Sequence, residues 1–202
     1  SVVIEGQFAG PVAEFIGTFG MPNLNKLKIL LNLQEYKENA KLSITKRADG
    51  QPDGINFENA SGDFKNNYRF MGEAVINDML KTVVLSANVN WGVEFTPTAA
   101  AIQKLRFQSQ AHSDATNFAT KLENGDLKIY FGDPSSHAGN FVFHAGVSGK
   151  LSKSWAWPVA VVISILGLPG DKTFKISDEG VAMITVDSGI AEYNYILPAQ
   201  TK

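Results

Sequence analysis

Three histidines and two neighbouring aspartates are the residues of this chain with the most potential for chemistry. They are His112, His137 and His144, with Asp114 and Asp133 nearby in sequence. Imidazole and carboxylate groups brought together can bind a metal ion or activate water for hydrolysis. Their spacing matches neither an H-E-x-x-H motif nor a nucleophile elbow. We therefore expect no enzymatic activity, no catalytic residue and no metal site.

Cofactor-binding and membrane-spanning patterns are also lacking. The glycines of GTFGMPN and GLPGDKTF come without a Walker lysine or dinucleotide spacing, so we expect no cofactor. The longest apolar run, WAWPVAVVISILGL, is too short to cross a bilayer, so we expect no membrane partner. The chain has no cysteine, which fits a reducing compartment. We predict a cytoplasmic protein, in the host cell cytoplasm if it is viral.

The second half of the sequence predicts two helices among several strands. WGVEFT at 91–96 alternates as a strand, and Thr-Pro then begins a helix over 97–110. Asn124-Gly125 joins two alternating runs and is a strong hairpin signal. The apolar segment 158–166 predicts a buried helix. Further strands are expected in NFVFHAGV, KTFKISDEG, VAMITVDSG and AEYNYILP.

The first half repeats part of this order. It predicts a strand over 12–19, a helix over 23–36, and three strands in AKLSITKRADG, DGINFEN and FKNNYRFM. The expected fold class is α+β, with two similar modules of antiparallel sheet covered by helices on one face. The expected modules are 1–72, incomplete at its start, and 91–202. Residues 73–90, which lack a clean period, form a connector between them.

The sequence resembles the DNA polymerase sliding clamps. The resemblance lies in the two predicted modules, the connector rich in apolar residues and the hydrophobic final strand. The match is closest to the clamps of tailed phages. It is carried by NLNKLKILLNLQEYKENAKLSI in the first half, and by VEFTPTAAAIQKL, ENGDLKIYFGD and KISDEGVAMITVDSGIAEYNYILPA in the second. The resemblance implies a ring, a homotrimer when each chain has two modules. Such a ring encircles duplex DNA and raises polymerase processivity without making or breaking a bond.

The resemblance also implies where DNA and partner proteins would bind. Duplex DNA would be held independently of its sequence by basic residues on inner helices, and the partners would be a DNA polymerase and a clamp loader. The candidate DNA-facing residues are Lys26, Lys28, Lys104, Arg106, Lys150 and Lys153. Any one of these could instead be an ordinary solvated charge on an amphipathic helix.

Partner proteins of clamps insert a short apolar peptide between the connector and the C-terminal tail. The candidate pocket residues are Val75, Ile76, Met79 and Leu80 from the connector, and Tyr195, Ile196, Leu197 and Pro198 from the tail. An alternative for Ile196 and Leu197 is that they pack under their own sheet.

A different class of protein is also compatible with the sequence. A β-rich structural or carbohydrate-binding protein of a virion could use exposed aromatic side chains as a binding face, with Tyr130, Trp155 and Trp157 as candidates. The competing expectation is that both tryptophans pack in the core.

Overall fold

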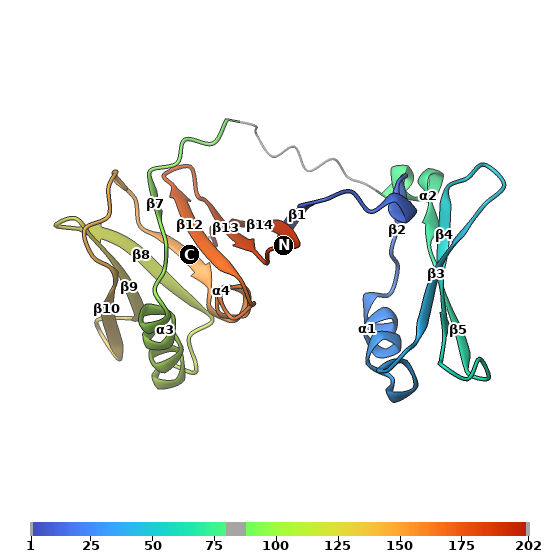
Figure 1. Cartoon of the computed structure of the whole chain (residues 1–202). Helices are drawn as coiled ribbons and strands as arrows, with labels where there is room; N and C mark the ends of the chain where they lie inside the picture. Colours follow the sequence, from blue (N-terminus) through green and yellow to red (C-terminus); the bar gives the residue numbers. More distant parts are fainter. Residues whose placement is uncertain (1, 80–87, 201–202) are drawn as a thin grey trace. The chain divides into compact units, whose positions relative to one another are not determined.

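The computed structural model of the chain describes residues 2–79 and 88–200 (Figure 1). Its contacts divide the chain into two compact units. The larger unit comprises Ser1–Gly10 and Ser86–Lys202, and the smaller unit comprises Pro11–Leu85.

This division differs from the predicted modules at two places. The first residues belong with the larger unit, because β1 (Val3–Phe8) pairs antiparallel with β14 (Ala191–Pro198). The predicted connector begins as a helix, α2 (Glu73–Met79), which contacts strands of the smaller unit. Leu80 and the following residues to 87 lie outside the described part of the chain.

The larger unit contains the same motif twice, in which a strand and a helix are followed by three strands. The first copy is β7 (Val93–Phe95), α3 (Ala99–Ala111), β8 (Asn117–Glu123), β9 (Asp126–Gly132) and β10 (Ala138–His144). The second copy is β11 (Trp155–Pro158), α4 (Val159–Leu166), β12 (Asp171–Ser177), β13 (Val181–Asp187) and β14. The strands form one sheet in the order β1-β14-β13-β12-β7 and another in the order β10-β9-β8-β11.

Alternation along the strands builds the core of the larger unit. Leu127, Ile129 and Phe131 in β9, like Ile184 and Val186 in β13, are buried at every second position. Because α3 and α4 contact each other and also contact these sheets, they cover the apolar faces as one helical layer.

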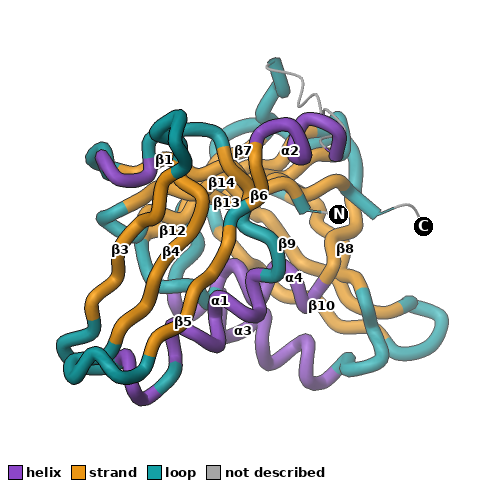
Figure 2. The backbone as a smooth tube through the Cα atoms, turned by 90° about the vertical axis from the view of Figure 1, so that its right-hand side faces the viewer, coloured by secondary structure: helices purple, strands orange, loops and turns teal. Residues whose placement is uncertain are grey.

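The smaller unit contains one copy of the same helix and strands. It runs through η1 (Ala13–Phe15), β2 (Phe19–Gly20), α1 (Leu24–Asn32), η2 (Gln34–Tyr36), β3 (Lys41–Lys46), β4 (Pro52–Glu58), β5 (Lys65–Arg69), β6 (Met71–Gly72) and α2. Strands β3, β4 and β5 run side by side (Figure 2). Leu24, Leu31 and Leu42 remain exposed, as expected for a unit whose described residues form a single three-stranded sheet beside one short strand pair.

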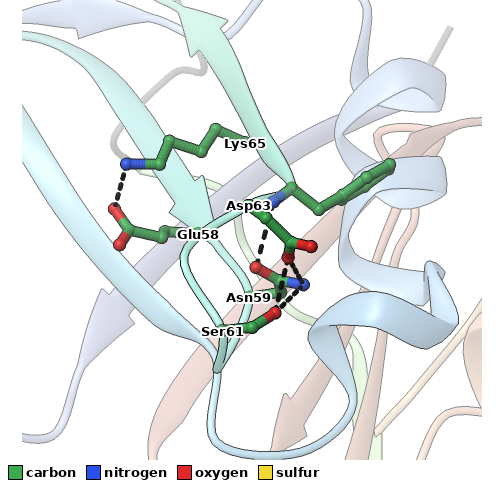
Figure 3. Close-up of polar contacts among 6 residues, drawn as sticks. Glu58, Asn59, Ser61, Asp63 and Lys65 are labelled. Atoms are coloured by element: carbon green, nitrogen blue, oxygen red, sulfur yellow. Dashed lines mark hydrogen bonds and ion pairs between the residues drawn. The ribbon is translucent and has the colours of Figure 1, made fainter.

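A buried asparagine fixes the turn between β4 and β5 (Figure 3). The Asn59 amide nitrogen donates to the Ser61 hydroxyl, to the Asp63 carboxylate at 2.9 Å and to the Glu35 carboxylate at 3.0 Å. Its amide oxygen accepts from the Phe64 backbone N–H. Hydrogen bonds from Ser61 and then Asn59 lower the pKa of the Asp63 carboxyl. The turn is therefore anchored to η2, and β5 is held in place as an edge strand.

The predicted α+β class with two similar antiparallel modules is confirmed, and so are the two helices of the second half. The helix expected over 23–36 ends earlier, at Asn32, and continues as the short η2. The strand predicted over 12–19 is wrong, because Ala13–Phe15 form a 3-10 turn and only Phe19–Gly20 pair. No helix within the described residues has both the length and the apolar character needed to span a bilayer.

Candidate nucleic-acid interface

Helix α3 is positioned by a side-chain cap and two buried residues. The Thr98 hydroxyl accepts a hydrogen bond from the Ala101 backbone N–H at 3.1 Å, which satisfies one free donor at the helix start. Ala101 and Leu105, four residues apart, are buried against the sheets. The exposed side of the helix therefore includes Gln103, Lys104, Arg106 and Phe107.

Helices α1 and α3 carry positive charge, and neither they nor α4 carry a negative charge. Lys26 and Lys28 on α1, and Lys104 and Arg106 on α3, are exposed, while α4 has no charged residue. No acidic side chain forms an ion pair with these four cations in the parts of the chain that the structure describes. The whole chain has a formal charge of −2, so its acidic excess lies entirely outside these helices.

Arg106 also lies against the end of the neighbouring helix. A Cβ atom added to Gly167, the residue that ends α4, would be 3.0 Å from the Arg106 Nη2 atom. A cation near a helix C-terminus interacts favourably with its free carbonyl groups. The small residue at 167 thus lets the guanidinium group bridge α3 and α4 at the exposed surface.

The structure does not place Lys150 and Lys153 with these helices. They lie in the loop before β11, and α4 begins only at the other end of that strand. The Asp178 carboxylate accepts hydrogen bonds from the Ser152 and Lys153 backbone N–H groups and from the Ser152 hydroxyl. The Lys153 ammonium group lies 5.6 Å from the ring centroid of Trp155. Local contacts of this loop therefore account for the position of Lys153.

The Asp178 contacts predict a pH-dependent contribution to stability. The Ser152 backbone N–H, and then the other donors, lower the pKa of this carboxyl despite some burial. Because the folded pKa lies below the unfolded one, the contribution is complete above the unfolded pKa and is lost as pH falls through the folded pKa. Asp178→Asn should therefore destabilise the larger unit at pH 7 and have a smaller effect at pH 3, which is below the ordinary aspartate pKa of about 3.9. Denaturant unfolding at both pH values measures this.

The exposed residue Asp114 offers a control for this experiment. Asp114→Asn removes the same charge from a position whose side chain makes no hydrogen bond within the described residues. It should change stability little at either pH. Equal effects of Asp178→Asn at pH 7 and at pH 3 would contradict the expectation.

The predicted peptide pocket draws on residues from both units. Val75 is 48% exposed on α2, whereas Ile76 is half-buried and lies close to Gly20. The Met79 side chain and Leu80 fall outside the described residues. Tyr195 is half-buried and Pro198 is exposed at the end of β14. The two groups belong to separately described units, so whether they meet stays a prediction.

Two tail residues are less accessible than a pocket wall requires. Leu197 is 1% exposed and belongs to the core of the larger unit, and Ile196 on the other face of β14 is 8% exposed. The tail beyond Pro198 is also held in place, since the Ala199 N–H donates to Gly180 O at 2.8 Å and the Gln200 N–H to Ala156 O at 2.9 Å. Leu197 therefore serves packing rather than an open surface.

The residues considered for catalysis or glycan binding are placed elsewhere. His112 stacks on Phe131 with ring centroids 5.7 Å apart, and His144 packs on Phe95. Among the residues with described positions, no three histidine, aspartate or glutamate side chains are grouped to hold a metal ion. The suggested aromatic face is wrong at Trp157, because its ring is fully buried in the core, where its indole N–H donates to Thr120 Oγ1.

Comparison with known proteins supports the fold assignment. The sequence matches no protein-family model and no curated protein. The structure is similar to a solved structure described as the C-terminal region of FEN-1 bound to A. fulgidus PCNA, with a TM-score of 0.57 at 9% sequence identity. The similarity covers 81% of this chain and 64% of that chain, so the present chain spans less than two thirds of its length. The chain has the PCNA-like fold of the DNA clamps.

Proposed function

We propose that this chain is a subunit of a sliding clamp, similar to those of tailed phages, that encircles duplex DNA and tethers a replicative DNA polymerase. The observation that carries the proposal is the charge of α1 and of α3. In an acidic chain with the DNA-clamp fold, each of these two helices has two exposed cations and no carboxylate, and α4 has no charged residue. Phosphate groups are the natural counterpart of such helix faces.

The small number of cations suits a protein that slides. Contacts to phosphate are independent of sequence, and each contact adds affinity through release of counterions. A surface with many such contacts would hold DNA in one place, whereas a few per subunit give weak binding that a closed ring makes persistent. The proposed mechanism therefore needs enclosure of the duplex more than affinity for it.

The internal repeat suggests how a ring would close. Strand β14 follows α4, β12 and β13, and β5 follows α1, β3 and β4 in the same order. Strand β1 precedes β2 and α1, just as β10 precedes β11 and α4. Because β1 pairs with β14 within the chain, the equivalent strands β10 and β5, each at a sheet edge, would pair between copies. Repetition of this contact would close a ring, and we propose a homotrimer because three copies with two modules each supply six modules.

Polymerase and clamp-loader binding is proposed for the outer surface. The structure that resembles this chain is named for the C-terminal region of FEN-1 bound to PCNA, which supports a partner-binding role for the shared fold. Accessible candidates for such contacts are Val75 on the smaller unit, and Tyr195 and Pro198 on the larger unit. The test is DNA synthesis by the cognate polymerase and loader on a primed circular template. We expect a longer product when this protein is added.

Duplex binding through the helices has a quantitative test. Lys104→Ala combined with Arg106→Ala should lower affinity for a labelled duplex. It should also reduce the slope of log K against log salt by about 0.9 for each phosphate that the double variant no longer neutralises. Fluorescence anisotropy over a salt series measures both quantities.

The double variant Lys150→Ala with Lys153→Ala is the matched control, since it removes the same charge from the loop before β11. It should change the slope less. Equal slopes for the two double variants would show that net charge alone sets binding, and would count against the helical interface.

A further inference from the structure

Phe107 is an exposed aromatic residue on the helix that carries Lys104 and Arg106. It is 57% exposed and does not belong to the core of the larger unit. Phe95, Phe118, Phe131 and Phe143 of this unit are buried, whereas Phe8 on β1 is exposed to a similar degree. Phe107 therefore places an exposed apolar ring in the middle of the polar side of α3.

The neighbours of Phe107 form a surface of mixed character. With 3.6 residues per turn, Gln103 and Lys104 lie one turn before it, Gln110 lies one turn after it, and all three are exposed. Arg106 is adjacent in sequence and extends toward Gly167 at the end of α4. The ring thus lies between two cations, with amide side chains on both sides.

We propose that Phe107 packs against the deoxyribose groups of duplex DNA, between phosphates that contact Lys104 and Arg106. This inference rests on the proposed clamp function and names a further contact at the same surface. Charge complementarity favours a nucleic acid as the occupant, because both charged residues of α3 are basic and the neighbouring α4 has no charged residue. Deoxyribose carbons lie between successive phosphates and offer an apolar surface at every nucleotide, so the contact is independent of sequence.

An apolar contact has a different salt dependence from a phosphate contact. It neutralises no phosphate and releases no counterion, so it contributes the same free energy at low and high salt. The phenyl ring would therefore keep the duplex close to α3 under conditions where the attraction of the two cations is weakened.

The test is the affinity of Phe107→Ala for a short labelled duplex across a salt series. We expect binding weaker by about fivefold at every salt concentration, as for removal of a partly buried ring, with an unchanged slope. Phe107→Leu keeps an apolar side chain and should retain most of the affinity. Ile190→Ala, at an exposed position in the turn before β14, should bind like the original protein. Alanine has the highest helix propensity, so Phe107→Ala should retain the fold of the protein.

Each alternative result has a distinct meaning. Unchanged affinity in Phe107→Ala would overturn this inference and leave the clamp proposal intact if the Lys104 and Arg106 double variant still lowers the slope. A changed slope in Phe107→Ala would also overturn it, because the ring would then act through the cations. Loss of polymerase binding with duplex affinity intact would overturn it too, and would assign the surface to a protein. If the Lys104 and Arg106 double variant leaves the slope unchanged, the helical DNA interface itself fails.

Discussion

Replacing Trp157 with alanine should destabilise the larger unit by about 3–5 kcal/mol, the cost measured for large aromatic residues deleted from protein cores. The Trp157 side chain is 0% exposed in β11, opposite Phe118 of β8. Its indole N–H donates to Thr120 Oγ1 at 2.9 Å, and Thr120 is itself buried. The substitution thus creates a cavity and removes the best partner of a buried hydroxyl group.

Calorimetry measures the expected destabilisation as a fall of roughly 10–20 °C in the unfolding temperature of the larger unit. The smaller unit has a separate core, formed by Leu30, Tyr36, Ile55, Phe57, Tyr68 and Phe70. Its transition should move much less. Trp157→Phe keeps most of the ring volume and should lose less stability than Trp157→Ala. A fall of under about 1 kcal/mol in Trp157→Ala would contradict the core position of this side chain.

Elements whose signals are local can be predicted from the sequence. Asn124 and Gly125 both have positive φ, 54° and 83°, as a two-residue hairpin turn requires, and β8 and β9 pair around them. Helix α3 begins after the predicted Thr-Pro signal, although Thr98 rather than Thr96 caps it. Turn and capping signals depend on a few adjacent residues, so they can be recognised without tertiary information.

Elements that depend on distant partners do not follow from local patterns. Strand β1 is absent from the predicted elements, because its pairing with β14 joins residues near opposite ends of the chain. Its Gly6 lies beneath the ring of Tyr193, where a Cβ atom would be 2.9 Å from the ring. Strand β11 is absent as well, since an apolar run does not by itself distinguish a strand from a buried helix.

The candidate interface can be predicted in part. The helical positions of Lys26, Lys28, Lys104 and Arg106 follow from periodicity. The loop position of Lys150 and Lys153 depends on β11, which the sequence does not reveal. Phe107 is missing from the predicted site, although its spacing from Gln103 and Gln110 already places it on the polar side of α3. The sequence does not decide whether Leu197 is buried, because alternation allows either face of a final strand to be covered.

Introducing two lysines on β10 should weaken assembly if β10 and β5 close the ring. Asn140 and Val142 are exposed on β10, on the side opposite buried Phe143. On β5, Lys65 and Arg69 are exposed on the side opposite buried Tyr68. If the apolar faces of the two strands align on pairing, these exposed side chains become cross-strand neighbours. Asn140→Lys with Val142→Lys would then place like charges together.

The expected penalty is about 1 kcal/mol per contact, and three equal contacts close a trimer, so the assembly constant should fall about a hundredfold. Sedimentation over a concentration series measures this change. Glutamate at positions 140 and 142 should strengthen assembly instead, because the same geometry then pairs opposite charges. Lys65→Glu with Arg69→Glu should restore assembly of the lysine variant. If both signs of charge at 140 and 142 gave the same oligomer distribution, β10 would not face β5 of another copy, and closure through these edges would be wrong.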